Sequence, residues 1–180
     1  MEIIETPLAG LLLIKPKIFG DERGYFFEPY QEERYHKAGI PCRFVQDNTS
    51  RSQKGVLRGL HYQRLQPQTK LIQILRGEVF DVVVDVRKNS PSFGQSFSYI
   101  LNDCNHHQLF IPEGFAHGFY VLSDVADFYY KCSDYYAPQF ESGILWNDPD
   151  LQIDWPIPAG ETPIVSAKDQ LHPRLKDKAI

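Results

Sequence analysis

The stretch Leu71-Ile-Gln-Ile-Leu-Arg-Gly77-Glu-Val79-Phe-Asp-Val-Val-Val-Asp-Val86 decides the fold class of this chain. Its two halves, Leu71–Leu75 and Val79–Val86, are short and rich in β-branched residues, as β-strands are. Gly77-Glu78 between them fits a hairpin turn. We therefore expect a pair of neighbouring strands here rather than a helix.

Charged side chains lie inside the second of these strands. One face of Val79–Val86 is entirely apolar, whereas the other alternates valine with Asp81 and Asp85. Carboxylates are costly in a sealed core, because a buried charge needs a partner. The strand therefore lines either a wet, functional interior or a solvent-facing edge, and its sequence alone favours neither.

Runs of the same kind recur along the chain and are bounded by Gly, Pro, Asn or Asp: Ser96–Leu101, His107–Ile111, Val125–Tyr130 and Gly143–Trp146. One polar stretch, Gln31–Ala38, is predicted to be a helix that ends at Gly39. Short strands without alternating helices indicate a mainly β fold, an antiparallel sandwich or barrel, in one domain over residues 1–180. Five prolines between residues 149 and 173 predict a final segment that wraps the surface.

The composition is that of a globular protein. Of 180 residues, 42% are hydrophobic and 13% aromatic, which excludes a disordered chain. Asp and Glu number 23 against 19 Lys and Arg, and the net charge of −4 is a poor match for nucleic acid or an anionic membrane. Three separated cysteines without a CxxC motif predict neither a disulfide framework nor a zinc knuckle. Since the N-terminus has no signal-peptide pattern, we expect a cytoplasmic protein.

Two further segments carry the chemistry. The first runs Gly55-Val-Leu-Arg-Gly-Leu-His61-Tyr-Gln63 and is followed by Lys70, and the second is Ile111-Pro-Glu-Gly-Phe-Ala-His117-Gly-Phe. Both resemble the paired motifs of cupins, small jelly-roll barrels of antiparallel strands that usually bind a metal. In cupins the first motif contains His-x-His and then a Glu, and the second contains Pro-x-Gly-x-x-His. His61 and His117 keep one histidine position in each motif.

The departures from the cupin pattern are as informative as the matches. The second histidine of the first motif is Gln63, and Lys70 stands where its glutamate would be. An ammonium group has no lone pair for a divalent cation, and two histidines alone are too few for a firm site. We therefore expect no metal and no other cofactor. A fixed organic cation would instead stabilise an oxygen that becomes negative.

A longer pattern, from about Phe19 to Asp169, resembles the dTDP-4-dehydrorhamnose 3,5-epimerases, a family of non-metal cupins. Besides the two segments above, it comprises Phe19-Gly-Asp-Glu-Arg23, Phe44-Val-Gln46-Asp47-Asn48, Gly77-Glu-Val-Phe-Asp81, Ser90-Pro-Ser-Phe-Gly94, Tyr135-Tyr136-Ala-Pro and Ser166-Ala-Lys168-Asp169. Each motif is weak alone, whereas their order and combination are specific. The resemblance implies a cupin-type jelly-roll barrel with a few short helices, and a homodimer that exchanges N-terminal strands.

The resemblance also implies a reaction, the inversion of C3 and C5 in a dTDP-linked 4-keto-6-deoxyhexose. The ketone at C4 acidifies both neighbouring C–H groups, so a base on one face and an acid on the other can invert each centre. By resemblance His61 is the base, which Asp169 orients, and Tyr130 returns a proton. Lys70 would face the developing enolate oxygen. Reference pKa values of about 6.5 for imidazole and 10 for phenol suit these roles.

The same resemblance implies residues that bind the dTDP-sugar substrate. Arg23 and Arg58 match positions that hold the diphosphate, for which guanidinium groups are suited. Tyr136 matches a ring that stacks on thymine. The complete set of expected binding residues is Phe19, Arg23, Glu28, Gln46, Asp47, Asn48, Arg58, His117, Tyr136, Glu141 and Lys168.

Several of these residues keep a structural alternative. Arg58 and His61 have opposite strand parity, so they share a site only if Gly59 hosts a bulge. Ser166 to Asp169 is also a capping-box pattern, Tyr130 suits a core, and Lys70 suits a solvated loop. The remaining histidines match no motif and are interpreted as surface residues: His36, His106, His107 and His172.

Three other functions stay open. The same chemistry could invert C3 or C5 alone, for another deoxysugar. A metal-binding cupin oxygenase would need iron, against which Gln63 and Lys70 argue. A silent sugar-nucleotide binding module would keep Arg23, Arg58 and Tyr136 without needing a base or an acid.

Overall fold

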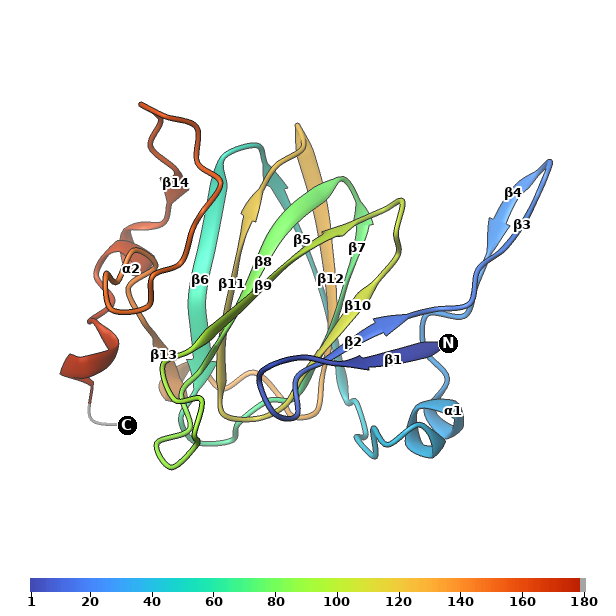
Figure 1. The fold of residues 1–180 in the computed structure, drawn as a ribbon, viewed down its shortest axis with the longest axis horizontal. Coiled ribbons are helices and arrows are strands. Elements are labelled where there is room, and N and C mark those ends of the chain that lie inside the picture. Colours follow the sequence, from blue (N-terminus) through green and yellow to red (C-terminus); the bar gives the residue numbers. More distant parts are fainter. Residues whose placement is uncertain (179–180) are drawn as a thin grey trace.

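Two β-sheets form the body of the molecule in the computed structural model, which describes residues 1–178 (Figure 1). The first sheet contains, in spatial order, β1 (Glu2–Glu5), β2 (Leu12–Lys15), β10 (Gln108–Ile111), β7 (Lys70–Arg76), β12 (Val125–Cys132) and β5 (Gln46–Gln53). The second contains β13 (Glu141–Gly143), β6 (Val56–Gln63), β11 (Phe115–Val121), β8 (Glu78–Asp85) and β9 (Ser96–Asn102). Neighbouring strands in both are antiparallel, and within residues 1–178 the only parallel pairing is that of β14 (Ile164–Val165) with β6. This is the mainly β jelly-roll architecture that the sequence predicted.

The helices are short and lie outside the sheets. The predicted helix is confirmed as α1 (Glu32–Lys37), and its N-cap Gln31 accepts a hydrogen bond from the backbone of Arg34. Near the C-terminus α2 (Ala167–Gln170) lies between the 3₁₀ helices η1 (Pro138–Phe140) and η2 (Leu175–Asp177) in chain order. A separate hairpin, β3 (Phe19–Asp21) and β4 (Gly24–Phe26), extends away from the sheets (Figure 1).

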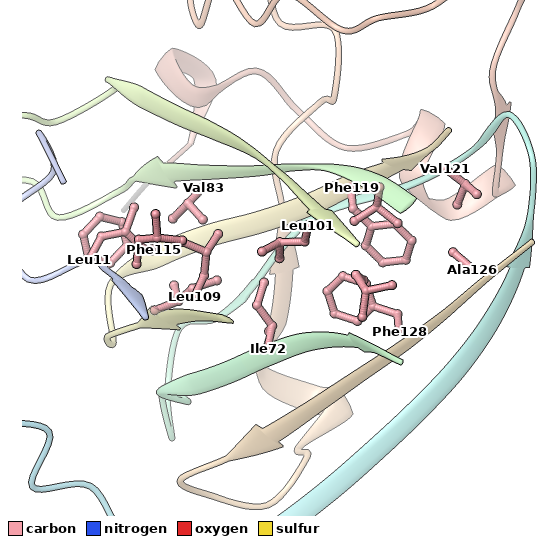
Figure 2. Packing of buried hydrophobic residues seen from close by; sticks show 14 of the residues in the cluster. Leu11, Ile72, Val83, Leu101, Leu109, Phe115, Phe119, Val121, Ala126 and Phe128 are labelled. Atoms are coloured by element: carbon pink, nitrogen blue, oxygen red, sulfur yellow. The ribbon is translucent and has the colours of Figure 1, made fainter. Parts of the chain in front are cut away.

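Apolar side chains from both sheets meet in the space between them (Figure 2). Ile72 and Phe128 belong to the first sheet, whereas Val83 and Phe119 belong to the second. The rings of Phe119 and Phe128 stack with their centroids 4.3 Å apart. The core therefore joins the two sheets and fills one part of the barrel, which leaves another part for polar groups.

Strand β8 is buried on both faces, so a solvent-facing edge is excluded for it. Val79 and Val83 point into the core between the sheets, and Asp81 shares their face. On the other face Val82 and Val84 pack under the C-terminal segment, in a cluster that includes Leu151 and Leu175. The wrapping role predicted for the proline-rich segment is thereby confirmed. Asp81 must find its partner inside the barrel.

The predicted hairpin at Gly77-Glu78 is wrong. The strands on either side of it, β7 and β8, belong to different sheets. The two backbone N–H groups at the turn donate to side chains of other loops, Gly77 to Asp103 Oδ2 at 2.7 Å and Glu78 to Ser123 Oγ at 2.8 Å. The turn therefore carries the chain from one sheet to the other, and local turn residues do not distinguish that corner from a hairpin.

Two strand assignments differ from the structure. The predicted strand Gly143–Trp146 is instead β13 (Glu141–Gly143), because the Leu145 N–H donates to Pro173 and the chain leaves the sheet. Strand β5 has the polar sequence Gln-Asp-Asn-Thr-Ser-Arg-Ser-Gln, which lacks the apolar alternation that marks most strands. It pairs with β12 along its whole length. Nothing among the described residues is a helix long and apolar enough to cross a membrane.

Candidate active site

A cavity of about 170 Å³ opens between the two sheets, beside the apolar core. Its walls are formed by Ser50, Arg58, His61, Lys70, His117, Gly118, Phe119, Phe128 and Tyr130. Strands β6 and β11 of the second sheet provide one wall, and β5, β7 and β12 of the first sheet provide the other. The structure thus brings together in one cavity all three catalytic candidates that were expected to face the sugar.

His61 is bound to a carboxylate behind its ring. Its Nε2 lies 2.8 Å from Asp169 Oδ1, while Asp169 Oδ2 accepts the Gly59 N–H at 3.1 Å. With Nε2–H donated to the carboxylate, Nδ1 is the ring nitrogen left to accept a proton. Burial acts to raise the pKa of Asp169, but the His61 imidazole and the Gly59 amide outweigh it and hold this pKa at about 2. The carboxylate therefore stays ionised and fixes the imidazole.

The capping alternative for Asp169 is compatible with this role. The backbone N–H of Asp169 donates to Ser166 Oγ at 3.1 Å, so Ser166 is the N-cap of α2. The Asp169 carboxylate does not complete a capping box and is used by His61 and Gly59 instead. One residue thus provides a backbone donor to the cap and a side-chain acceptor to the site.

Gly59 resolves the parity conflict between Arg58 and His61. The β6–β11 register shifts between the partners of these two residues, and Gly59 has φ +117°. A Cβ atom at this position would lie 2.5 Å from Gly118 Cα, so glycine is required by both the backbone angle and the close approach. The bulge lets Arg58 and His61 line the same cavity, as the sequence required.

Lys70 and Tyr130 approach from the opposite wall. The Lys70 ammonium lies 5.7 Å from the centre of the Tyr130 ring, and the two residues come from the neighbouring strands β7 and β12. Burial raises the pKa of Tyr130 to about 12, so its hydroxyl keeps its proton. Burial lowers the pKa of Lys70, which nearby negative groups counteract. A proton donor and a cation therefore face the imidazole across the cavity.

His117 forms a second imidazole–carboxylate pair that the motif comparison did not foresee. It stands opposite His61 in the β6–β11 ladder, and its Nε2 lies 2.9 Å from Asp81 Oδ2. Burial raises the pKa of Asp81, and the His117 ring opposes that shift. Oδ1 of Asp81 is buried without a hydrogen-bond partner among the described residues. The alternation of valine with aspartate in β8 was the sequence signal for this inward carboxylate.

The residues that depart from the metal-binding cupin pattern have other uses. Gln63 donates to the Gln66 carbonyl at 2.6 Å and accepts the Ala137 N–H at 2.8 Å, so its amide ties two loops together. Lys70 lines the cavity with an ammonium group at the position where cupins have a carboxylate. This donor set does not suit a metal ion at the cupin position.

A polar rim leads from the cavity to the surface. Tyr136 donates its hydroxyl to Glu141 Oε2 at 2.7 Å, and the Lys168 ammonium pairs with the same oxygen. The Tyr136 N–H donates to Gln46 Oε1 at 3.0 Å, and the Gln46 amide donates to Asn48 at 2.9 Å. Tyr136 is 52% exposed, so this large aromatic residue is accessible from the surface. Five of the expected binding residues thus form one hydrogen-bonded chain.

Four of the expected binding residues are not brought to this cavity. Phe19 and Arg23 lie on the β3–β4 hairpin, where Arg23 pairs with Asp21, and Glu28 follows the hairpin and pairs with Arg34. Asp47 lies on the face of β5 opposite Gln46 and Asn48, as strand alternation requires. There it pairs with Lys131 at 2.8 Å.

Two histidines that were interpreted as surface residues lie partly or wholly inside the fold, since His106 is buried and His172 is half-buried. His106 packs against the rings of Tyr25 and Phe27, with centroids 4.6 and 4.9 Å away. His172 packs edge to face on His61, with ring centroids 5.6 Å apart, and its Nε2 lies 3.7 Å from Asp169 Oδ1. No motif spacing connects His172 with His61, because the two meet only when the C-terminal segment folds over β6.

Comparisons with known proteins agree with this geometry. The model of the family described as dTDP-4-dehydrorhamnose 3,5-epimerase matches residues 5–177. A protein of that name from Methanothermobacter thermautotrophicus is 49% identical over 177 residues, which cover 98% of this chain and 96% of the relative.

Solved structures give the same result. The Legionella pneumophila dTDP-6-deoxy-D-glucose-3,5-epimerase, solved with dTDP-4-keto-L-rhamnose, is 57% identical with a TM-score of 0.93, covering 97% of this chain and 93% of that one. A 3'-monoepimerase from Streptomyces bikiniensis, solved with dTDP-quinovose, is 33% identical with a TM-score of 0.88, covering 95% and 86%. Since the family model matches residues 5–177 and the Methanothermobacter relative is 49% identical over 98% of the chain, the chain belongs to the dTDP-4-dehydrorhamnose 3,5-epimerase family.

Proposed function

We propose that this protein inverts C3 and C5 of dTDP-4-dehydro-6-deoxy-D-glucose and so forms dTDP-4-dehydro-L-rhamnose for deoxysugar synthesis. One observation carries the proposal: a carboxylate-bound imidazole and a tyrosine hydroxyl reach one cavity from opposite walls, with an ammonium group beside the tyrosine. Inversion needs a base and an acid on opposite faces of the sugar. A single binding cavity between two sheets provides both.

The first step is removal of a proton from carbon. Nδ1 of His61 takes the C3 or C5 hydrogen, and the electron pair of the broken C–H bond moves toward the C4 oxygen to give an enolate. The Asp169 carboxylate, ionised behind the ring, stabilises the imidazolium that forms. The Lys70 ammonium supports the negative oxygen, an effect that is strongest when the charge has developed.

The second step returns a proton from the other side. Tyr130 donates its hydroxyl proton to the carbon, the enolate collapses back to the ketone, and the configuration is inverted. The tyrosinate regains a proton from solvent, and the imidazolium releases its own, so the cycle closes without an electron acceptor. Nearby Arg58 and Lys70 are cations that stabilise the transient tyrosinate.

The nucleotide would lie along the polar rim. The exposed ring of Tyr136 offers a stacking face for the base, and Arg58 offers a guanidinium group to the diphosphate. Gln46, Asn48, Glu141 and Lys168 provide the hydrogen-bonding groups around them. This arrangement supports a nucleoside diphosphate sugar as the substrate class.

We also propose that two copies of the chain form a homodimer in which the N-terminal hairpin of one completes the site of the other. The hairpin extends away from the barrel (Figure 1). Its residues Phe19, Tyr25 and Phe26 are 53%, 60% and 66% exposed. Such apolar surface is expected to be covered by a partner. The expected diphosphate ligand Arg23 lies on the same hairpin, away from the cavity of its own chain.

Mixing two inactive variants tests the exchange. Arg23→Ala removes the donated residue, and His61→Asn removes the base, so each homodimer should be impaired. A heterodimer formed by co-refolding would contain one site with an intact base and a donated Arg23, and its activity should rise well above that of either parent. Co-refolded heterodimers with no such gain would contradict the exchange.

The three cysteines, Cys42, Cys104 and Cys132, are unpaired thiols, which supports a reducing compartment such as the cytoplasm. A test of that placement is fractionation of the producing cells. The protein should appear with cytoplasmic markers, and recovery with periplasmic or membrane markers would contradict it.

The reaction itself is tested by proton NMR of dTDP-4-dehydro-6-deoxy-D-glucose in deuterated water with chelator-treated protein. Deuterium should enter at both C3 and C5, and the L-rhamno product should form. Label at one carbon would instead identify a single-centre enzyme like the Streptomyces bikiniensis relative, and label at neither would overturn the proposal. The exposed-site variant His36→Gln controls for general effects of losing a histidine.

A further inference from the structure

His172 occupies a position behind the catalytic pair that has no role in the proposed reaction. Its Nε2 is buried, faces Asp169 Oδ1 at 3.7 Å, and has no hydrogen-bond partner among the described residues. An unsatisfied buried nitrogen costs free energy unless something binds it. The side chain is only 11% exposed, so bulk water does not remove that cost.

The space for this imidazole depends on one glycine. Gly143 pairs with His61 in the β13–β6 ladder, and a Cβ atom at Gly143 would lie 2.2 Å from His172 Nε2. The Cβ of any other residue at this position would clash with the ring and displace it. Strand β13 and the segment after α2 thus place a second imidazole nitrogen beside the carboxylate that already holds the first.

We infer that His61, Asp169 and His172 form a binding site for a divalent transition-metal ion of the zinc class. Their ligand atoms all lie within 4.8 Å of one another. Tetrahedral coordination with bonds of 2.0–2.1 Å places ligand atoms about 3.3 Å apart. Asp169 Oδ1 lies 2.8 Å from His61 Nε2 and 3.7 Å from His172 Nε2, one distance shorter and one longer than that value. Two imidazoles and one carboxylate are a ligand set that zinc accepts, with water in the fourth position.

This site differs from the metal position of cupins. That position would use the side chains at His61, Gln63, Lys70 and His117, so His61 belongs to both sets. The present cluster lies on the Nε2 side of His61, away from the face that receives substrate. His172 lies outside the motifs that carry the family resemblance. The inferred site is therefore a property of this chain's own C-terminal segment.

The charges around the cluster set its affinity for a metal ion. Asp169 contributes the negative charge of the ligand set, and Glu141 lies nearby with its carboxylate paired to Lys168. The Lys178 ammonium, which hydrogen-bonds Ser142 and approaches the Tyr62 hydroxyl, is a second cation close to His172. Two lysines oppose a dication, so binding should be reversible and removed by a chelator.

Occupancy of the site would stop the reaction, an effect that rests on the proposed function. A metal ion takes the electron pair of His61 Nε2, and the proton held there moves to Nδ1, so the ring stays neutral. Nδ1–H has no lone pair in the ring plane to accept a proton from carbon. The ion should therefore lower kcat and leave KM largely unchanged, because it does not enter the substrate cavity.

Cobalt(II) is the probe for binding, since its visible absorption distinguishes tetrahedral from octahedral coordination. Titration of the chelator-treated wild-type protein should give the tetrahedral spectrum with one ion per chain. His172→Phe keeps a ring of similar size but removes the ligand, and the association constant should fall at least about 10- to 100-fold, the cost of losing even a supporting contact of a metal site. His172→Gln serves the same purpose if the first variant does not fold, and His36→Gln is the matched control.

Zinc inhibition gives the second readout. For each variant the ratio of kcat without and with added zinc should be large in the wild type and in His36→Gln, and close to one in the His172 variants. Wild-type protein that fails to bind cobalt tetrahedrally, or His172 variants that bind it equally well, would overturn the site. Cobalt binding is measured without substrate, so it tests the metal site whether or not the protein is an epimerase. An absence of epimerase activity would count against the proposed function only.

Discussion

His61 and His117 stand opposite one another in the β6–β11 ladder, and the Nε2 of each binds a carboxylate of its own. The two imidazoles differ in access, because the His61 side chain is 29% exposed and that of His117 only 9%. They also differ in their carboxylates. The pKa of Asp169 is lowered to about 2, whereas burial raises the pKa of Asp81. His61 therefore has the accessible ring and the firmly ionised partner that a general base needs, and His117 does not.

Substitution of each histidine separately tests this assignment. His61→Asn should reduce deuterium incorporation at C3 and C5 by about 100- to 10,000-fold, the range for a lost general base. His117→Asn should retain exchange and act mainly on KM, because its ring lines the cavity without being the base. Both rates come from NMR in deuterated water at saturating substrate. Equal losses of exchange in the two variants would contradict the distinction between them.

Lys70 should contribute more to turnover than to binding. Its ammonium faces an oxygen that is a neutral ketone in the bound substrate and an enolate only after deprotonation. Lys70→Met keeps the apolar stem, and it should lower kcat by about 100- to 1,000-fold, as the loss of one oxyanion donor does. Steady-state kinetics measure the effect. A rise in KM with unchanged kcat would show that Lys70 only holds the substrate.

The site was more predictable than the path of the chain through it. His61, Lys70, Asp169 and Tyr130 could be named because family motifs fix their spacing, and the bulge at Gly59 could be deduced from parity alone. Asp47 lies apart from Gln46 and Asn48 because a motif covers adjacent residues, whereas strand alternation sends neighbours to opposite faces.

Long-range contacts explain the remaining differences. Gly77-Glu78 has the residues of a hairpin, but Asp103 and Ser123 from distant loops bind its N–H groups and turn the chain into the other sheet. The polar strand β5 gives no periodic signal, since its inward side chains serve the site rather than the core. His172 meets His61 only through the C-terminal wrap. None of these contacts has a local sequence signature.

Tyr130 should control the outcome of the reaction rather than its first step. Tyr130→Phe leaves His61 and Lys70 in place, so proton removal and some exchange should persist. Delivery of a proton from the opposite face should be impaired, and the ratio of singly to doubly inverted product should change. NMR of the products measures that ratio. An unchanged product ratio at an unchanged rate would show that another group is the acid. Tyr129→Phe, at the adjacent position, is the control substitution.

The alkaline limit of activity should report on Lys70 and not on Tyr130. Burial lowers the pKa of Lys70 below its ordinary value of 10.5, whereas burial raises that of Tyr130 to about 12. As pH rises, the ammonium is therefore lost before the phenol, and kcat should fall with it. Lys70→Arg keeps the cation at high pH, so the fall in kcat should shift to higher pH, whatever the effect of the substitution on the maximum rate. If activity falls at the same pH in Lys70→Arg as in the wild type, deprotonation of Lys70 is not the cause of the fall.

Asp85 should stabilise the fold in a way that depends on pH. Its side chain is fully buried at the end of β8 and accepts hydrogen bonds from Arg87, Ser90 and Ser92. Burial acts to raise its pKa, but these donors hold the pKa well below its usual 3.8. Since the folded pKa is the lower one, the stabilisation is complete above about pH 4 and is lost as pH falls through the folded value.

Asp85→Asn should therefore lower the free energy of unfolding at neutral pH by about 2 kcal/mol, because buried donors lose a charged acceptor. The difference between wild type and variant should shrink as pH falls below about 4, where the unfolded wild-type carboxyl takes up its proton. Urea denaturation across this pH range measures both effects. Asp127→Asn, which removes the carboxylate of an exposed pair with Arg51, is the matched control and should change stability much less. A constant difference at all pH values would show that Asp85 acts through its shape and not through its charge.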